Sequence, residues 1–352
     1  MVEIAKSLMT DAKTIIMDEP TAALTEKEID LLFGVVRSLK KKGVSFIYIS
    51  HRMEEIFKIA DRVTVMRDGI SVSTYDVGKV DMKQIVHDMV GRDMGDFYPE
   101  RNPNFGEIVM EVQHLTENNV FKDVNFTVRE EEILAFSGLM GAGRTEIMRA
   151  IFGIDKFNEG NIIIGGKKAK IHSPQQAINL NVGFLTENRK DEGLILDSSI
   201  YDNIALPSID GFTKHKLIDD KVIGDFVNRL MKRLTVKAMG SDVEVGSLSG
   251  GNQQKVVLAK WIGSGTQVLI LDEPTRGVDV GAKREIYDLM NELTERHVAI
   301  IMISSDLPEV LGMSDRIAVV YEGQITGIID TKNATQEKVM TLATGGKINA
   351  KS

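Results

Sequence analysis

The stretch LSGGNQQKVVLAKWIGSGTQVLILDEPT, residues 248–275, decides the fold of this 352-residue chain. Two glycines follow Ser249 at the expected start of a helix, where unpaired backbone N–H groups attract phosphate. The apolar run 267–271 then ends at Asp272-Glu273, as a buried parallel strand does. Because α/β proteins bind ligands at the carboxyl edge of their sheet, the stretch predicts an α/β fold with a phosphate site. A glycine-containing loop before a capped helix is the alternative interpretation of Ser249-Gly250-Gly251.

The start of the chain repeats its end at a spacing of 254 residues. Asp18-Glu19-Pro20-Thr21 aligns with Asp272-Glu273-Pro274-Thr275, and residues 1–69 share 18 identities with residues 255–323 without a gap. Average composition gives about four identities, so the sequence predicts a duplicated unit. Residues 106–254 have no upstream counterpart. We therefore expect the first copy to be incomplete, with Met1 an internal methionine of a longer protein.

Three segments are expected from this repeat. Residues 1–90 form the end of a first domain, residues 91–106 form a linker rich in turn formers, and residues 107–352 form a second, complete domain. Within the second domain, 108–112 and 124–128 alternate like antiparallel strands, and 133–137 is typical of a buried strand. We expect residues 1–90 to be poorly stable alone, because a missing strand would expose a sheet edge and an apolar face.

The composition excludes several classes of function. The chain has no cysteine, which excludes disulfides, cysteine-bound zinc and iron–sulfur clusters. The net charge of −8 argues against nucleic acid as the main partner. The longest apolar runs, such as 298–303, are too short to cross a bilayer.

A glycine-rich turn, GLMGAGRT at residues 138–145, has the spacing of a phosphate-binding P-loop. Glycines let backbone N–H groups curl around phosphates, and the helix that follows adds positive potential. Arg144 stands where a lysine is expected, and a planar guanidinium does not replace a compact ammonium between phosphates. A tight turn without a ligand is the alternative interpretation of the motif alone.

Two Asp-Glu pairs follow buried strands at matching places in the repeat. We expect each aspartate, Asp18 and Asp272, to hold magnesium, and each glutamate to orient or deprotonate an attacking water. His51 lies 32 residues after Glu19, where it could contact a γ-phosphate, and the second copy has Ser305 at that place. This asymmetry predicts one working site and one degenerate site.

Together these motifs resemble the nucleotide-binding domain of ABC transporters, and the tandem arrangement resembles the sugar-import ATP-binding subunits of the ribose, galactoside and xylose type. GLMGAGRTE, LSGGNQQKV and LILDEPTRGVDVGAK look most like the ribose-type members. Two departures stand out, because Glu187 occupies the place of the Q-loop glutamine and Glu131-Glu132 replaces a Lys-Gly turn. A tandem ABC protein acting on ribosomes is a weaker match, since such proteins have a longer charged linker.

The resemblance implies an α/β fold of tandem ABC-type P-loop domains, each with a RecA-like core, an antiparallel β subdomain and a helical subdomain. It implies the cofactors ATP and Mg²⁺, integral-membrane sugar permease subunits as partners, and indirectly a periplasmic or extracellular sugar-binding protein. The chain would sit peripherally on the cytoplasmic face of the bacterial plasma membrane. The alternative function is a degenerate, nucleotide-binding partner that does not hydrolyse ATP, or a truncated gene product. The implied ATP-binding residues are Gly138, Gly141, Ala142, Gly143, Arg144, Thr145, Ser249, Gly250 and Gly251; the metal ligands are Asp18, Asp272 and Thr145; the catalytic residues are Glu19, His51 and Glu273.

Overall fold

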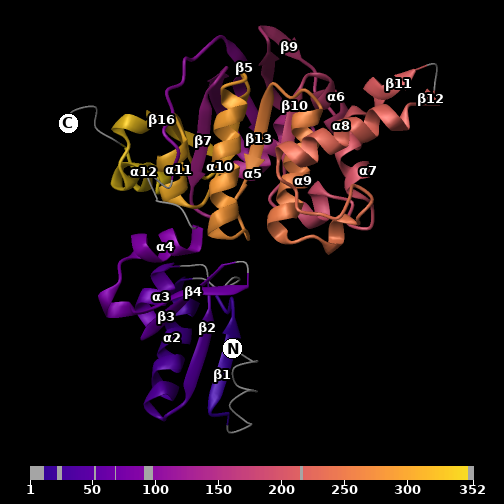
Figure 1. Ribbon diagram of the computed structural model, residues 1–352. Coiled ribbons are helices and arrows are strands. Elements are labelled where there is room, and N and C mark those ends of the chain that lie inside the picture. The colour runs from indigo at the N-terminus through magenta and orange to yellow at the C-terminus, as the bar shows by residue number, and fades with distance from the viewer. Residues whose placement is uncertain are drawn as a thin grey trace. The chain divides into compact units, whose positions relative to one another are not determined.

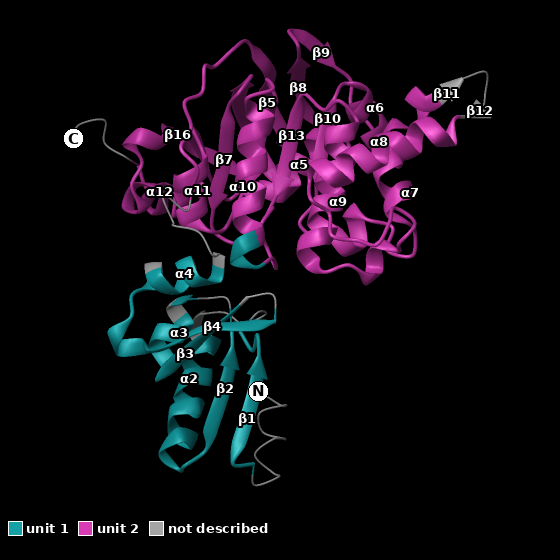
Figure 2. Ribbon diagram, viewed as in Figure 1, with its two compact units in different colours: residues 1–95, 279–281 teal, residues 96–278, 282–352 magenta. Residues whose placement is uncertain are grey.

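A computed structural model describes residues 12–21, 26–50, 53–67, 69–90, 98–214 and 217–347. The chain divides into two compact units (Figure 2), residues 1–95 with 279–281 and residues 96–278 with 282–352. The second unit is the larger of the two, and it contains both the glycine loop 138–145 and the stretch 248–275.

The core of the second unit is a six-stranded sheet with the strand order β10-β13-β14-β7-β15-β16 (Figure 1). The first five strands are parallel and β16 is antiparallel to β15. Every residue of β13 and β14 is buried, because both strands lie inside the sheet and read as continuous apolar runs. The strands are β7 (Ile133–Gly138), β10 (Val182–Leu185), β13 (Val268–Asp272), β14 (Ala299–Ile303), β15 (Arg316–Tyr321) and β16 (Gln324–Asp330).

Helices surround this sheet, and a second, antiparallel sheet packs beside it. The second sheet has the order β6-β5-β8-β9, and its Phe126 packs edge-on against Phe136 of β7 at 5.1 Å. The antiparallel pair predicted at 108–112 and 124–128 lies within β5 and β6 and is confirmed. The strands are β5 (Ile108–Glu117), β6 (Phe121–Arg129), β8 (Glu159–Ile164) and β9 (Lys167–Ala169), and the helices are α5 (Arg144–Ile151), α6 (Pro174–Asn179), α10 (Val280–Thr294), α11 (Leu307–Met313) and α12 (Gln336–Ala343).

A helical region separates β10 from β13 along the chain. Its amphipathic helix α8 buries Ile223, Val227 and Leu230 on one face. Its helix α9 begins at Gly250, directly after Ser249. The elements are α7 (Ile200–Ala205), the hairpin β11 (Thr213–Lys214) and β12 (Leu217–Ile218), α8 (Asp220–Arg233) and α9 (Gly250–Gly263), with short π or 3₁₀ turns at Arg189–Gly193, Leu206–Phe212 and Val245–Ser247.

The first unit contains a parallel pair, β1 with β2, and an antiparallel hairpin, β3 with β4. Helix α2 buries Ile29, Leu32, Phe33 and Val36, which lie on one face at a 3.6-residue period, against the pair. The elements are β1 (Thr14–Asp18), α2 (Glu26–Lys41), β2 (Ser45–Ile49), α3 (Met53–Ile59), β3 (Arg62–Arg67), β4 (Ile70–Asp76) and α4 (Met82–Val90).

The backbone of the first unit recurs in the second at the spacing found in the sequence. The pairing Thr14↔Ser45 between β1 and β2 becomes Val268↔Ala299 between β13 and β14. The two hairpins also share an irregularity, between Val65 and Met66 in one and between Val319 and Val320 in the other. A one-residue slip would reverse every side chain, so the shared register is a specific structural repeat.

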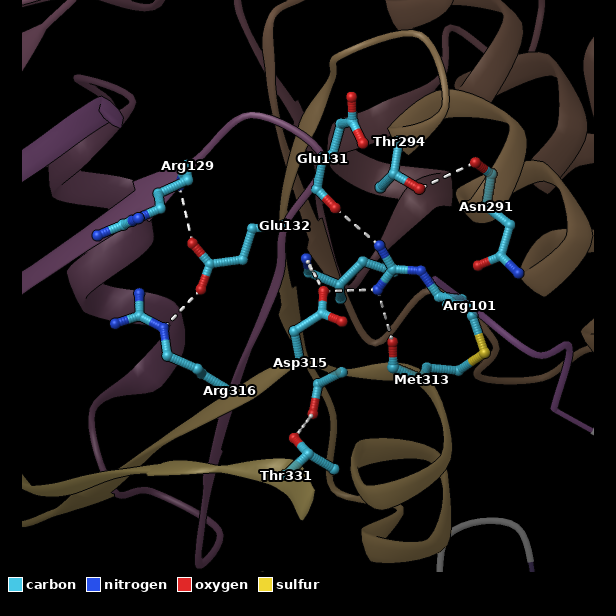
Figure 3. A network of polar contacts seen from close by, with 12 residues as sticks. Arg101, Arg129, Glu131, Glu132, Asn291, Thr294, Met313, Asp315, Arg316 and Thr331 are labelled. Atoms are coloured by element: carbon cyan, nitrogen blue, oxygen red, sulfur yellow. Dashed lines mark hydrogen bonds and ion pairs between the residues drawn. The ribbon is translucent and has the colours of Figure 1, made fainter. Parts of the chain in front are cut away.

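Residues 98–106, the described part of the expected linker, belong to the second unit, where Arg101 forms an ion pair and backbone hydrogen bonds (Figure 3). Arg101 contacts Asp315 at 2.7 Å and donates to the Glu131 carbonyl at 2.8 Å. Glu131 has a left-handed φ of 64° and accepts a bond from the Asn104 N–H, while the buried Glu132 pairs with Arg316 at 2.6 Å. Glu131-Glu132, unexplained from sequence, therefore anchors the linker and the hairpin of β15 and β16.

Candidate functional site

The glycine loop 138–145 joins β7 to α5 and has the backbone that a phosphate cradle requires. Gly138, Gly141 and Gly143 all have positive φ, of 154°, 76° and 100°. A Cβ on Gly138 would lie 2.3 Å from the Val320 carbonyl oxygen, so no other residue fits there. Gly143 caps α5, and the first N–H groups of that helix are therefore available to an anion.

The loop brings Thr145 beside Asp272 at the end of β13. The Thr145 hydroxyl donates to Asp272 Oδ2 at 2.8 Å. Asp272 is 1% exposed, and its Oδ1 is buried without a hydrogen-bond partner. Burial raises the pKa of Asp272 to about 6, although the Thr145 bond opposes this shift. An orphaned carboxylate oxygen beside a hydroxyl fits a hard cation such as Mg²⁺, which prefers oxygen ligands and takes few of them from protein.

Glu273 is held in a left-handed conformation at the tip of the same strand. Its φ is 47°, its N–H donates to the Ile303 carbonyl at 2.9 Å, and its Oε2 accepts a bond from the Ser305 hydroxyl at 3.1 Å. Burial raises the pKa of Glu273 to about 7. The carboxyl group is thus poised to exchange a proton near neutral pH, as a general base requires.

Arg144, the first residue of α5, forms a hydrogen bond to a neighbouring strand end, and its charge lowers the pKa of both Asp272 and Glu273 against the effect of burial. Its guanidinium donates to the Ser304 carbonyl at 2.9 Å, at the end of β14. Arg144 thus connects the start of α5 to a neighbouring strand end. A planar guanidinium favours such a fixed contact, whereas the ammonium group of a lysine does not.

Ser249-Gly250-Gly251 forms the start of α9, as the sequence predicts. Ser249 is exposed at the N-cap and accepts a bond from Asn252 at 2.9 Å. A Cβ on Gly250 would lie 2.7 Å from an Arg189 nitrogen, so glycine permits this close approach. Among the described residues, no hydrogen bond joins this helix start to the loop 138–145.

In the described residues of the first unit the strand end recurs, but no glycine loop like 138–145 does. Glu19 has a φ of 45°, and its N–H donates to the Ile49 carbonyl at 2.9 Å, as at Glu273. Asp18 is exposed, unlike Asp272. His51, expected to contact the γ-phosphate, lies outside the described residues.

The sequence interpretation missed two features near the strand ends. Thr275 and Ser304 both donate to Glu309, a buried residue on α11. Glu187, at the place of a Q-loop glutamine, forms an ion pair with Arg276. Glu309 could have been found from the repeat, because it is one of the 18 identities and matches Glu55.

Comparison with known proteins places this geometry in a family. The model of the ABC transporter family matches residues 121–276. The ribose import ATP-binding protein RbsA of Lacticaseibacillus paracasei is 78% identical over 346 residues, which are 98% of this chain and 69% of that protein. The Bacillus subtilis protein of the same name is 61% identical over 99% of this chain and 70% of its own length. The chain belongs to the ABC transporter family of ATP-binding proteins.

Solved ABC structures share the fold. The cbiO1 subunit from Clostridium perfringens, part of an ABC transporter complex, has a TM-score of 0.56 at 23% identity, covering 67% of this chain and 93% of that one. An ATP-binding cassette of an ABC transporter in its ADP conformation has a TM-score of 0.57 at 19% identity, covering 68% and 100%. The expected ABC-type P-loop α/β fold is confirmed. In the described part of this ABC protein, no helix is long and apolar enough to span a bilayer.

Proposed function

We propose that this chain is the ATP-binding subunit of a bacterial sugar importer, and that it couples ATP binding and hydrolysis to passage of a ribose-type monosaccharide through membrane permease subunits. The main support is the phosphate-binding loop 138–145, which lies beside the Thr145–Asp272 pair. In addition, the chain is 78% identical to a ribose import ATP-binding protein. The partners proposed are the permease and, indirectly, an external sugar-binding protein. The proposed location is the cytoplasmic face of the membrane.

The domain organisation proposed is a tandem of ABC domains, with residues 1–90 from the first, 91–106 as linker and 107–352 as the second. The repeated register, the shared hairpin irregularity and the matching φ of Glu19 and Glu273 support a duplicated unit. In this arrangement, Ser249-Gly250-Gly251 serves a nucleotide held by another domain's glycine loop. The lack of a hydrogen bond between 249–251 and 138–145 agrees with such a division.

Each residue proposed for the site has a chemical role. Backbone N–H groups of 138–145 hold the phosphates, and Thr145 and Asp272 hold Mg²⁺, which offsets the charge on the transferred phosphoryl group. The carboxylate of Glu273, or of Glu19 in the first unit, orients water and takes its proton. Asp18 has the corresponding metal-binding role in the first unit, and His51 the γ-phosphate contact.

A second candidate function concerns the second unit alone, which we propose binds nucleotide and turns it over slowly. Arg144, which stands where a lysine is expected, is bonded to the Ser304 carbonyl, and Ser305 occupies the place that corresponds to His51. A serine hydroxyl does not supply the positive charge that a protonated histidine brings to a γ-phosphate.

The proposed function is tested by ATP turnover of the chain with its permease and by ribose uptake in cells that lack and regain the chain. Glu273→Gln is expected to lower turnover about 100-fold if the second unit hydrolyses ATP, the scale of losing a general base, and less than about threefold if its site is degenerate. Glu295→Gln, an exposed glutamate, is the control. Uptake that is unchanged without the chain would overturn the proposal.

A further inference from the structure

A buried glutamate ties two strand ends together in the second unit. Glu309 on α11 is 1% exposed. Its Oε1 accepts a bond from the Thr275 hydroxyl at 2.8 Å, and its Oε2 accepts a short bond from the Ser304 hydroxyl. Thr275 lies two residues after Glu273, and Ser304 directly precedes Ser305. One carboxylate therefore holds both segments that meet at the Glu273–Ser305 bond.

The first unit contains the same tie at the same spacing. Glu55 on α3 is 4% exposed and accepts bonds from Thr21 at 2.8 Å, from Ser50 at 3.2 Å and from Tyr48 at 2.8 Å. Thr21, Ser50 and Glu55 lie 254 residues before Thr275, Ser304 and Glu309. The neighbouring strands are far more exposed in the first unit, so the tie does not depend on how the sheet around it is covered.

These hydrogen bonds to a buried glutamate stabilise an unusual backbone conformation at the strand ends. Glu19 and Glu273 both have a left-handed φ near 46°, which costs a residue other than glycine about 1 kcal/mol or more and persists only where surrounding contacts fix it. Each is fixed on one side by its N–H bond to Ile49 or Ile303. On the other side, the bond from Thr21 to Glu55, or from Thr275 to Glu309, fixes the residues that follow Glu19 or Glu273. The backbone is thus held on both sides of the left-handed residue. Burial raises the pKa of Glu309, and its bonds from Ser304 and Thr275 lower it, so these hydroxyls favour the charged acceptor.

We propose that Glu309, and Glu55 in the first unit, are positioning residues that hold the water-orienting glutamate of each strand end against the segment that faces it. Neither touches the nucleotide in this assignment, and each acts through a threonine and a serine. The expected effect on ATP turnover rests on the proposed function. The hydrogen bonds of the buried glutamate can be tested without nucleotide.

The test removes one hydroxyl and then restores it. Thr275→Val keeps the shape of the side chain, whereas Thr275→Ser keeps the donor. In the full chain without nucleotide, amides of 273–276 and 304–306 are expected to exchange with deuterium about tenfold faster in Thr275→Val, the factor for one buried hydrogen bond. Thr275→Ser is expected to restore the original rate, and amides of β10 should not change. Thr344→Val, at an exposed threonine that bonds only backbone carbonyls, is the control.

A second measurement connects the tie to turnover. In the ATPase assay with the permease, Thr21→Val is expected to lower kcat about tenfold with KM for ATP within about twofold, and Thr21→Ser to restore kcat. Uniform acceleration of exchange across the second unit, or no local change, overturns the inference even if ATP is hydrolysed. An unsubstituted chain that neither binds MgATP nor turns it over overturns the proposed function, while the exchange result still decides the tie.

Discussion

The parallel pairs β1–β2 and β13–β14 have the same register and several of the same residues, yet they differ in burial. Ile16 is 66% exposed and Ile47 is 52% exposed, whereas Ile270 and Ile301 at the matching places are fully buried. In the second unit β10 and β7 flank the pair, and in the described residues of the first unit no strand does. Local sequence therefore sets the register and the strand ends, while neighbouring strands decide what those residues contribute to stability.

The same contrast applies to a charged residue. Asp61 and Asp315 match in the repeat and both follow a helix. Asp61 pairs with Lys40 on the surface, with a side chain 77% exposed. Asp315 is 12% exposed, pairs with Arg101 and accepts the Ile133 N–H at 2.8 Å. The matching aspartates thus form a solvated ion pair in the first unit and a largely buried ion pair in the second.

The largest expected consequence is a difference in resistance to protease. Residues 1–90 expose apolar strand faces, so local opening there costs less free energy than in the second unit. Limited proteolysis of the full chain is expected to cut within 1–90 about a thousandfold faster than within 106–340, because cleavage follows the open population. Equal resistance of the two segments would contradict the role assigned to flanking strands.

A matched pair of substitutions makes this comparison quantitative. Ile301→Ala should destabilise the second unit by about 4 kcal/mol, because it leaves a cavity in a dry sheet core. Ile47→Ala, the same change at the matching place, should cost under about 1 kcal/mol, because that side chain is half exposed. Hydrogen exchange of amides in β14 and β2 measures both opening free energies. Similar losses at the two sites would show that burial in the sheet is not the deciding difference.

The aspartate pair gives a pH-dependent version of the same test. Burial raises the pKa of Asp315 and the Arg101 charge lowers it. Arg101→Met should raise that pKa further and cost about 3 kcal/mol at pH 8, since it leaves a largely buried carboxylate without its cationic partner. The folded state then binds the proton more tightly than the unfolded chain, so stability falls as pH rises from about 4 and the loss is smaller at pH 5.

Urea unfolding followed by the fluorescence of Trp261, the single tryptophan of the chain, reports the second unit. Lys40→Met, which removes the surface partner of Asp61, should cost under about 1 kcal/mol at both pH values, as hydrogen exchange of β3 can show. An equal loss in Arg101→Met at pH 5 and pH 8 would contradict the assigned cause.

Much of the fold could be predicted from the sequence, because apolar runs ending in Asp-Glu and glycine-rich turns have local causes. The strands around Asp272 and the helix start at Gly250 follow from such patterns, whereas Thr145 and Asp272 were expected at one metal site only from the family resemblance. The anchoring role of Glu131-Glu132 could not be predicted, since Arg316 and Arg101 reach it from distant parts of the chain. Glu309 was missed for a related reason, because its partners Thr275 and Ser304 follow different strands.

The smallest expected effect concerns Arg144, where the two units cannot be compared directly. Its guanidinium donates one hydrogen bond to the Ser304 carbonyl. Arg144→Lys should free a compact ammonium for the phosphates and tighten MgATP binding about tenfold, the worth of one charge-assisted contact. Fluorescence titration with a labelled nucleotide measures the change, and Arg149→Lys, on the same helix but paired with Asp155, is the control. Weaker binding in Arg144→Lys would mean that the arginine itself holds phosphate, and its bond to Ser304 would then not explain a degenerate second site.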